Sequence, residues 1–323
     1  FEPEHTIDIF SATSEHITLD LDHKESPLNL QRRLFLDYWS LKNLILALVV
    51  ANKLKDYDIV IPTNGGWQSI IIRLLTWIYG NKMIIFGHSG IGWDDRVNLW
   101  TCPNCFVALS NYSSKWAAKV NPFINIVHIP IPVNLDKFSP IGPKTKNIKL
   151  PHPLALAVAA AVHSKQLDKT IEAVARVPNL SLVLLSSGPD VDYLDQLAQQ
   201  LLPHRYQRVR VNQLEIPNWY READIFTLCP WANESFPVVY LEAMASNLPI
   251  VATKDPIRIE AIGDAGLFVN PHNTEEYSSA LEKALRINWG NKPLFRAKQY
   301  SHKSIYSKYL LLFKEVANYE KFT

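Results

Sequence analysis

The feature that most constrains the fold is a regular alternation of short apolar segments with longer segments of helical periodicity. When each strand is followed by a helix, the helix carries the chain back across the sheet, and neighbouring strands run parallel. The alternation forms two series, separated by residues 131–153, which hold five prolines and little periodicity. We therefore expect an α/β protein with two Rossmann-like domains, each built on a doubly wound parallel sheet.

The two series predict the following elements. The first has strands near 6–10, 58–62, 83–86, 105–109 and 124–129, and helices near 30–54, 68–79 and 112–120. The second has strands near 154–161, 181–186, 208–211, 224–229, 250–253 and 267–269, and helices near 165–176, 193–202, 217–222, 237–246, 256–262 and 274–286. An amphipathic helix near 301–322 ends the chain. The expected division is an N-terminal domain at 1–135, a C-terminal domain at 136–300 and a terminal helix at 301–323.

The composition is that of an ordinary globular protein. Of 323 residues, 47% are hydrophobic and 20% charged, and the net charge is +2, which gives no reason to expect nucleic acid as a partner. Three cysteines are too few for a disulfide framework and favour a reducing, cytoplasmic compartment. Cys102 and Cys105 form a lone CxxC pair, and a zinc or redox site needs a second pair. We expect no metal, and we expect Cys105 to begin a strand.

Two interpretations of the helix near 30–54 remain open. Its basic residues lie among Leu, Phe, Trp and Ile side chains, as in a helix bound at a membrane surface, which would bring the protein to the inner membrane surface. The other interpretation, which we favour, is a core helix with a solvated basic edge. The most apolar stretch, 44–51, is too short to span a bilayer.

The most informative residues for function are Glu234 and Glu242. The strand near 224–229 leads into a loop with Glu234, where Ser235 can cap a helix whose first turn accepts Pro237. Asn247 can adopt the left-handed conformation that ends this helix. Glu242 falls in the middle of the apolar helix, where an ionised carboxylate needs a partner.

The chemistry of this turn suggests a ligand. A helix that begins just after a strand attracts anions, because its free N–H groups and its dipole point at them. Two carboxylates would repel a phosphate, unless they accept hydrogen bonds from hydroxyls, one on a sugar and one on a ribose. Such a combination describes a nucleotide-sugar site. The alternative is a helix with one capped end and one buried, paired glutamate, and the local chemistry leaves both open.

The wider pattern resembles a known family. Glu234, seven residues, Glu242 and the following run Ala243–Ala252 resemble the retaining family 4 glycosyltransferases of GT-B fold, also called glycosyl transferases group 1. Supporting similarity extends through residues 127–130, 134–138, 157–175 and 262–269. The resemblance implies a GT-B fold and a hexosyltransferase that uses a nucleotide-diphosphate sugar with retention of configuration. It also implies a glycan, lipid or small-molecule acceptor, and neither a cofactor nor a metal.

The resemblance further implies roles for individual residues. Glu234 would hold the hydroxyls of the donor sugar, Glu242 the ribose and Lys165 the leaving diphosphate. His88 would sit beside the transferred sugar. The remaining implied positions belong either to the donor site or to loops of the first domain that face the cleft. The donor positions are Ser235, Phe236, Val238 and Gly188, and the loop positions are Asn64, Gly65, Gly66, Gly87 and Gly90. The loop with Asn64 either contacts the acceptor or donor or is a tight turn before a helix.

This chain also departs from the family pattern. Ala160 stands where the family has an arginine on the diphosphate, Phe236 stands where it has a glycine, and Pro237 offers no N–H. The family begins one βα unit earlier, with a glycine-rich loop, whereas the first glycine here is Gly65. We therefore expect the first domain to lack this unit, through truncation or loss.

Two other functions stay open on these grounds. One is a non-catalytic nucleotide-sugar-binding protein, and the other is an isomerase similar to the nucleotide-sugar 2-epimerases, which share the GT-B fold. A dehydrogenase is not expected, because no G-x-G-x-x-G follows a first strand. Asp94 and Asp95 are expected in a solvated loop.

Overall fold

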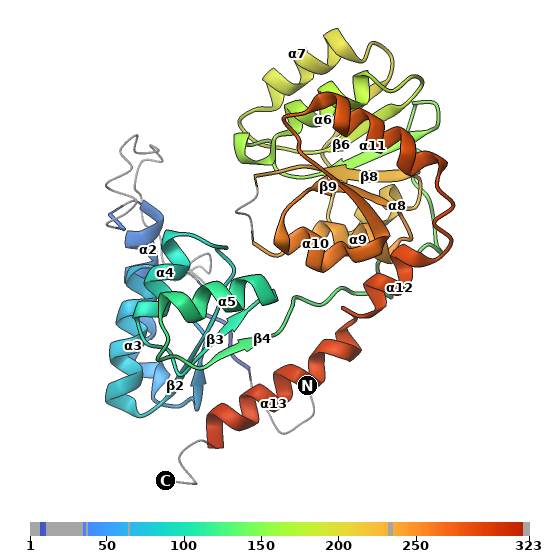
Figure 1. The fold of residues 1–323 in the computed structure, drawn as a ribbon. Coiled ribbons are helices and arrows are strands. Elements are labelled where there is room, and N and C mark those ends of the chain that lie inside the picture. Colours follow the sequence, from blue (N-terminus) through green and yellow to red (C-terminus); the bar gives the residue numbers. More distant parts are fainter. Residues whose placement is uncertain (1–6, 11–34, 37, 64, 232–234, 319–323) are drawn as a thin grey trace. The chain divides into compact units, whose positions relative to one another are not determined.

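The structure is a computed structural model that describes residues 7–10, 35–36, 38–63, 65–231 and 235–318 (Figure 1). The chain divides into two compact units. The first comprises the residues up to 109, residues 113–128 and the chain from Leu310 onwards, and the second comprises residues 110–112 and 129–309. Each is described below by itself.

The first unit contains a parallel sheet with the strand order β1-β2-β3-β4. The strands are β1 (Ile59–Val60), β2 (Lys82–Phe86), β3 (Cys105–Ala108) and β4 (Ile126–His128). The helices before and between them are α2 (Tyr38–Leu54), α3 (Trp67–Tyr79), α4 (Trp93–Trp100) and α5 (Asn111–Val120). The predicted alternation is thus confirmed here, and Cys105 begins β3 as expected.

The core of the first unit joins α2 to the sheet. Ala47 of α2, Met83 and Ile85 of β2, and Phe106 of β3 are at most 1% exposed and belong to one apolar cluster. Phe10 packs against this cluster and meets the Tyr57 ring edge-on, with 6.0 Å between ring centroids.

Three predictions for the first unit need correction. Ile7–Phe10 form no strand, because they pair with no strand of the described sheet and Phe10 instead packs through its ring; Thr6 lies outside the described residues. The described helix begins at Tyr38, after Phe35 turns the chain with a φ of 54°; residues 30–34 and 37 are outside the described part. The expected loop at Asp94 and Asp95 is helix α4, and Asp95 is only 2% exposed, because one face of this helix packs inward.

The second unit contains a six-stranded parallel sheet in the order β10-β9-β8-β5-β6-β7. Its strands are β5 (Leu154–Val158), β6 (Ser181–Leu185), β7 (Tyr206–Val209), β8 (Ile225–Leu228), β9 (Ile250–Thr253) and β10 (Gly266–Val269). Its helices are η1 (His163–Lys165), α6 (Leu167–Ala175), α7 (Val191–Leu201), α8 (Ile216–Tyr220), α9 (Val238–Ala245), α10 (Pro256–Ile262), η2 (Gly263–Ala265), α11 (Thr274–Arg286) and α12 (Lys292–Lys298). Helix α13 (His302–Asn318) runs from this unit into the first.

This strand order reverses direction between β5 and β8. Because crossovers between parallel strands are right-handed, α6 and α7 lie on one face of the sheet and α9 and α10 on the other, as Figure 1 shows. The loops after β5 and β8 therefore leave toward opposite faces. Ligands of open α/β sheets bind in the crevice that this divergence creates.

Helix α9 confirms one of its predicted ends and corrects the other. It ends before Asn247, which has the left-handed φ of 63° expected of a stop. It begins at Val238 with Pro237 in the capping position and no side-chain cap, so the predicted Ser235 cap is wrong. Ser235 lies two residues before the capping position, which Pro237 occupies.

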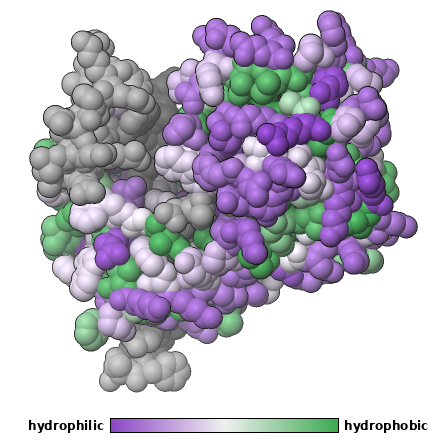
Figure 2. All heavy atoms as spheres, turned by 45° about the horizontal axis from the view of Figure 1, so that its top comes forward, coloured by the Kyte–Doolittle hydropathy of each residue, from purple (hydrophilic) through white to green (hydrophobic). Residues whose placement is uncertain are grey.

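Each unit buries apolar residues in its core, while other large apolar side chains, such as Trp77, Ile78 and Phe123, are exposed. On the face shown in Figure 2, hydrophilic residues make up most of the coloured surface, and hydrophobic residues appear in separate areas. Among the helices that the structure describes, none is long and apolar enough to cross a membrane.

A hydroxyl cluster in the core of the second unit yields a test of its packing. The Tyr277 hydroxyl, on a fully buried ring, lies 2.6 Å from Thr227 Oγ1 and 3.2 Å from Thr170 Oγ1. Tyr277→Phe leaves these hydroxyls short of a partner and should lower the free energy of unfolding of this unit by about 1–3 kcal/mol. Urea denaturation is the measurement. Tyr193→Phe, on a 55% exposed side chain, is the control, and equal effects of the two changes would contradict the prediction.

Candidate functional site

The reversal point of the second sheet brings two loops together. After β5 the chain turns through Ala159–Val162 into η1, and the carbonyl of Ser164 accepts a hydrogen bond from the backbone N–H of Trp231 at 3.0 Å. The His163 and Trp231 rings also meet edge-on, with 5.5 Å between centroids. Lys165, at the end of η1 and partly buried, is thereby fixed relative to the loop that follows β8.

Gly188 fits a third loop, after β6, against the first. The N–H of Ala161 donates to the Ser187 carbonyl at 2.9 Å, and the N–H of Asp190 donates to the Ala161 carbonyl at 3.1 Å. Gly188 has a φ of 149°, and a Cβ there would lie 2.6 Å from the Ala161 oxygen. Only glycine permits this approach, so Gly188 shapes the turn that carries Lys165.

Glu242 has the partner that its position in α9 requires. The Tyr220 hydroxyl donates to Glu242 Oε2 at 3.0 Å. Burial raises the pKa of Glu242 from 4.5 to about 7, against the opposing effects of the Tyr220 hydrogen bond and the positive charge of Lys137. The carboxyl group of Glu242 therefore titrates near neutral pH.

The start of α9 offers few amides to an anion. Phe236 is 7% exposed, and its ring lies 5.9 Å from that of Tyr300. Its carbonyl accepts the N–H of Val238 at 3.1 Å, and Pro237 has no N–H to give. Ser235 is partly buried just before this turn, and Glu234 lies outside the described residues.

Arg258 is committed to the protein itself. The loss of the family's arginine at Ala160, which is exposed, raises the question of another base for a diphosphate. Arg258 is 1% exposed and paired with Asp255, and its guanidinium lies 6.0 Å from the Tyr240 ring centroid. This arginine holds the start of α10 in place and is not presented to a ligand.

The first unit gathers a second set of predicted residues at the carboxyl ends of β1 and β2. Gly66 has a φ of 66° beside the Phe35 ring, and a Cβ at Gly87 would lie 2.7 Å from Phe106 Cζ. Gly65 and Gly90 lie in the same two loops, which adjacent strands bring side by side. Asn64 is outside the described residues.

His88 lies exposed on the second of these loops. Its ring is stacked on Phe86, with 5.9 Å between centroids. Desolvation on that side lowers the pKa of His88 below its usual value of 6.5. The imidazole is therefore neutral at neutral pH and can donate or accept a hydrogen bond.

A buried polar cluster under these two loops was missed by the sequence reading. Ser69 donates to Asn98 Oδ1 at 2.9 Å, and Asn98 donates to Asp95 Oδ1 at 3.2 Å. All three are at most 4% exposed. The signal in the sequence was the spacing of Asp95, Asn98 and Leu99, which places them on one face of a helix.

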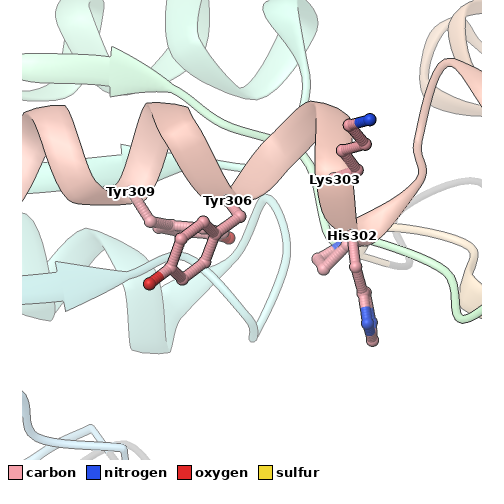
Figure 3. Close-up of a pocket in the computed structure, with 5 residues that line it drawn as sticks. His302, Lys303, Tyr306 and Tyr309 are labelled. Carbon is pink, nitrogen blue, oxygen red and sulfur yellow. The ribbon is translucent and has the colours of Figure 1, made fainter. Parts of the chain in front are cut away.

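A separate hollow of about 360 Å³ lies beside the first turns of α13. Its lining includes Pro132 and the α13 side chains shown in Figure 3, His302, Lys303, Tyr306 and Tyr309. None of the predicted site residues that the structure describes is among its lining residues. Within the described ranges, no three His, Cys, Asp or Glu side chains form a group that could hold a metal ion.

Comparison with known proteins identifies the family. The family model for glycosyl transferases group 1 matches residues 141–303, half of the chain, so this chain belongs to that family. It has the GT-B fold, in which two Rossmann-like domains occur in one chain. Anabaena HepE, solved in complex with UDP and glucose, is similar with a TM-score of 0.71 at 15% identity, covering 84% of this chain and 82% of HepE. Sucrose-phosphate synthase from Thermosynechococcus elongatus gives 0.73 at 17% identity, covering 88% and 79%.

Two curated relatives align over shorter ranges. The D-inositol 3-phosphate glycosyltransferase of Corynebacterium aurimucosum is 40% identical over 90 residues, which are 25% of this chain and 21% of that protein. The GDP-mannose-dependent alpha-(1-6)-phosphatidylinositol monomannoside mannosyltransferase of Mycolicibacterium smegmatis is 25% identical over 193 residues, 54% and 50% of the two chains. The aligned part of this chain thus spans no more than half the length of either relative.

The close packing at Gly188 yields a prediction. Gly188→Ala adds both a strained backbone and a contact with the Ala161 carbonyl, whereas Gly290→Ala adds only the strain, since nothing lies within 4 Å of its Cβ position and its φ is 54°. The strain alone should cost about 1–2 kcal/mol of folding free energy. In urea denaturation we expect Gly188→Ala to lower the free energy of unfolding more than Gly290→Ala does. An equal or smaller decrease for Gly188→Ala would contradict this prediction.

Proposed function

We propose that this protein is a retaining glycosyltransferase that moves a hexose from a nucleotide-diphosphate sugar to an acceptor. The observation that carries the proposal is the junction at the reversal point of the second sheet. There the turn with Lys165 is hydrogen-bonded to the loop after β8, which leads directly into the helix with Glu242. In this proposal Lys165 supplies a cation and Glu242 a carboxylate that accepts hydroxyls at the crevice in which open α/β sheets bind ligands.

The proposal gives each group one role. Lys165 neutralises charge on the leaving diphosphate, Glu242 accepts hydrogen bonds from the ribose, and Glu234 from the donor sugar. His88, neutral at neutral pH, contributes a hydrogen bond beside the sugar. The leaving phosphate accepts the acceptor's proton on the same face, which accounts for retention, and the protein contributes positioning and electrostatic stabilisation.

The same proposal covers membership of family 4, the donor and acceptor, and the location in the cell. HepE was solved with UDP and glucose, and the mycobacterial relative is named for GDP-mannose, which supports a nucleotide sugar as donor. The acceptor is a glycan, a lipid or a small molecule, and no cofactor or metal is required. The N-terminal domain, 1–135, takes the acceptor, the domain at 136–300 takes the donor, and the helix at 301–323 returns toward the first. The protein acts in the cytoplasm, with the inner membrane surface as the alternative location.

A second candidate is a nucleotide-sugar-binding protein without transferase activity. Ala160, Pro237 and the commitment of the Val238 amide to the Phe236 carbonyl all weaken the diphosphate site, which favours it. Calorimetry with UDP- and GDP-sugars, followed by an assay of donor hydrolysis, separates the two. Binding with hydrolysis supports the enzyme, binding alone supports the second candidate, and absence of binding overturns both.

The pKa of Glu242 yields a prediction for nucleotide binding. A carboxylate accepts hydrogen bonds from both ribose hydroxyls, while a carboxylic acid accepts fewer, so nucleoside affinity should rise as pH increases through about 7. Nucleosides without phosphate avoid the titration of the ligand itself. Glu242→Gln should weaken binding by roughly 1.5–3 kcal/mol at about pH 8 and remove the pH dependence. Calorimetry across this range is the measurement, and unchanged affinity in Glu242→Gln would place the ribose elsewhere.

The weakened diphosphate site yields another prediction. Negative charge on the leaving oxygens grows in the transition state, so Lys165→Ala should lower kcat far more than it raises KM for the acceptor. Ala160→Arg, at an exposed position, should tighten nucleoside diphosphate more than nucleoside, because only the former carries phosphates. Paired calorimetry and turnover test this. Equal effects on both ligands, or full activity without Lys165, would move the phosphate site.

A further inference from the structure

We propose that Asp95, acting with Asn98, is a positioning residue that holds the His88–Gly90 loop and the adjoining Gly65 loop in the geometry needed for sugar transfer. The inference deepens the proposed function and rests on it for the catalytic consequence, while the structural part stands on its own.

The carboxyl group of Asp95 is tied directly to the loop that carries His88. The backbone N–H groups of Ser89 and Gly90 lie close enough to it to lower its pKa. The loop also passes close above it, since a Cβ at Gly87 would lie 3.2 Å from Asp95 Oδ2. These two amides are not part of the sheet, and the buried carboxyl group beside them is the polar group that we infer to position the backbone after His88.

Asn98 extends the same control to the loop after β1. Its Nδ2 donates to Asp95 Oδ1, and its Oδ1 accepts from Ser69 of α3, so its orientation is set from both sides. A Cβ at Gly65 would lie 3.3 Å from Asn98 Oδ1. One buried cluster therefore lies against both of the glycine-containing loops that are expected to face the cleft.

The burial of Asp95 argues that the carboxyl group has a function. An isolated buried carboxylate is strongly unfavourable, and an apolar residue of similar size often serves stability as well or better. Burial raises the pKa of Asp95 from 3.8 to about 7, and the nearby Asp94 raises it further, while Asn98 and the two loop amides lower it. The two loop amides thus favour the ionised form of Asp95, and the ionised carboxylate in turn stabilises this conformation of the loop.

The surroundings of Asp95 restrict which groups take part in its titration. On its own helix the charged neighbours are Asp94 and Arg96, and on the loop the titratable group is His88. Helix α3 contributes Ser69 and β3 contributes Phe106, neither of which ionises near neutral pH. A transition assigned to Asp95 should therefore disappear in Asp95→Asn and persist in His88→Gln.

The structural arm of the test is amide hydrogen exchange of the whole protein without ligand. Asp95→Asn keeps the size of the side chain but replaces an acceptor oxygen with a donor, so exchange at Ser89 and Gly90 should accelerate by at least about tenfold. Asp94→Asn, one residue away and partly buried, is the matched control and should not change these rates. The Gly87 amide, which donates to the Val107 carbonyl at 3.0 Å, is the internal reference and should also stay constant.

A second variant covers the case in which Asp95→Asn does not fold. Ser69→Ala removes only the hydroxyl that orients Asn98, and exchange at Ser89 and Gly90 should again accelerate, by less than in Asp95→Asn. Unchanged exchange at both amides in the folded variants would overturn the inference.

The catalytic arm measures kcat/KM for sugar transfer against pH. The wild-type profile should rise through about pH 7 and lose this rise in Asp95→Asn. Asp94→Asn should keep the rise but move it to lower pH, because Asp94 raises the pKa of Asp95. Because Asp95 acts through the loop, Asp95→Asn should cost little more in a His88→Gln background. If the wild type transfers no sugar while the exchange result holds, the proposed function fails and the positioning role stands; if transfer occurs without the exchange result, the positioning role fails alone.

Discussion

The handedness of the crossovers in the second unit is the constraint on which the rest of the site depends. Right-handed connections and the order β10-β9-β8-β5-β6-β7 force the chain to leave β5 and β8 toward opposite faces. At this reversal point the bond between the Trp231 amide and the Ser164 carbonyl ties the loop after β8 to the turn after β5. The turns after β5 and β6, which lead to Lys165 and hold Gly188, meet because the carboxyl ends of adjacent parallel strands lie at the same edge of the sheet.

The two units achieve rigidity at their strand ends in different ways. In the second unit the loops are held backbone to backbone, with Gly188 pressed against Ala161 because no side chain intervenes. In the first unit a side-chain cluster of Ser69, Asn98 and Asp95 supports the loops from below. The backbone contact of Gly188 with Ala161 has no titratable group. The side-chain cluster of the first unit includes the Asp95 carboxyl group, which has a pKa of about 7.

The departures from the family pattern are concentrated around the diphosphate. Ala160 removes a guanidinium, Pro237 removes an amide, and the Phe236 carbonyl occupies the amide of Val238. Arg258 does not compensate, because its charge is neutralised by Asp255 in the core. The groups for hydroxyls are better preserved, since Glu242 is present, oriented by Tyr220 and able to ionise near neutral pH. If the proposed roles hold, binding should therefore depend more on the nucleoside and sugar hydroxyls than on phosphate charge.

The sequence by itself determined the features that depend on local periodicity and on single residues with special backbone preferences. The alternation of strands and helices, the stop at Asn247, the start of β3 at Cys105 and the bounds of α11 were all readable, because each follows from residues near in the chain. The family resemblance added the pair of acids.

Tertiary structure decided what depends on contacts between distant segments. Asp95 reads as a solvated acid until α4 packs inward against a loop from another strand end, and Ile7–Phe10 read as a strand until the sheet offers them no partner. The partner of Glu242 comes from Tyr220, more than twenty residues earlier, and the Val238 amide is taken by a local turn that Pro237 permits. Burial and hydrogen-bond partners are established only when the chain is folded, and they set the pKa values of Asp95 and Glu242.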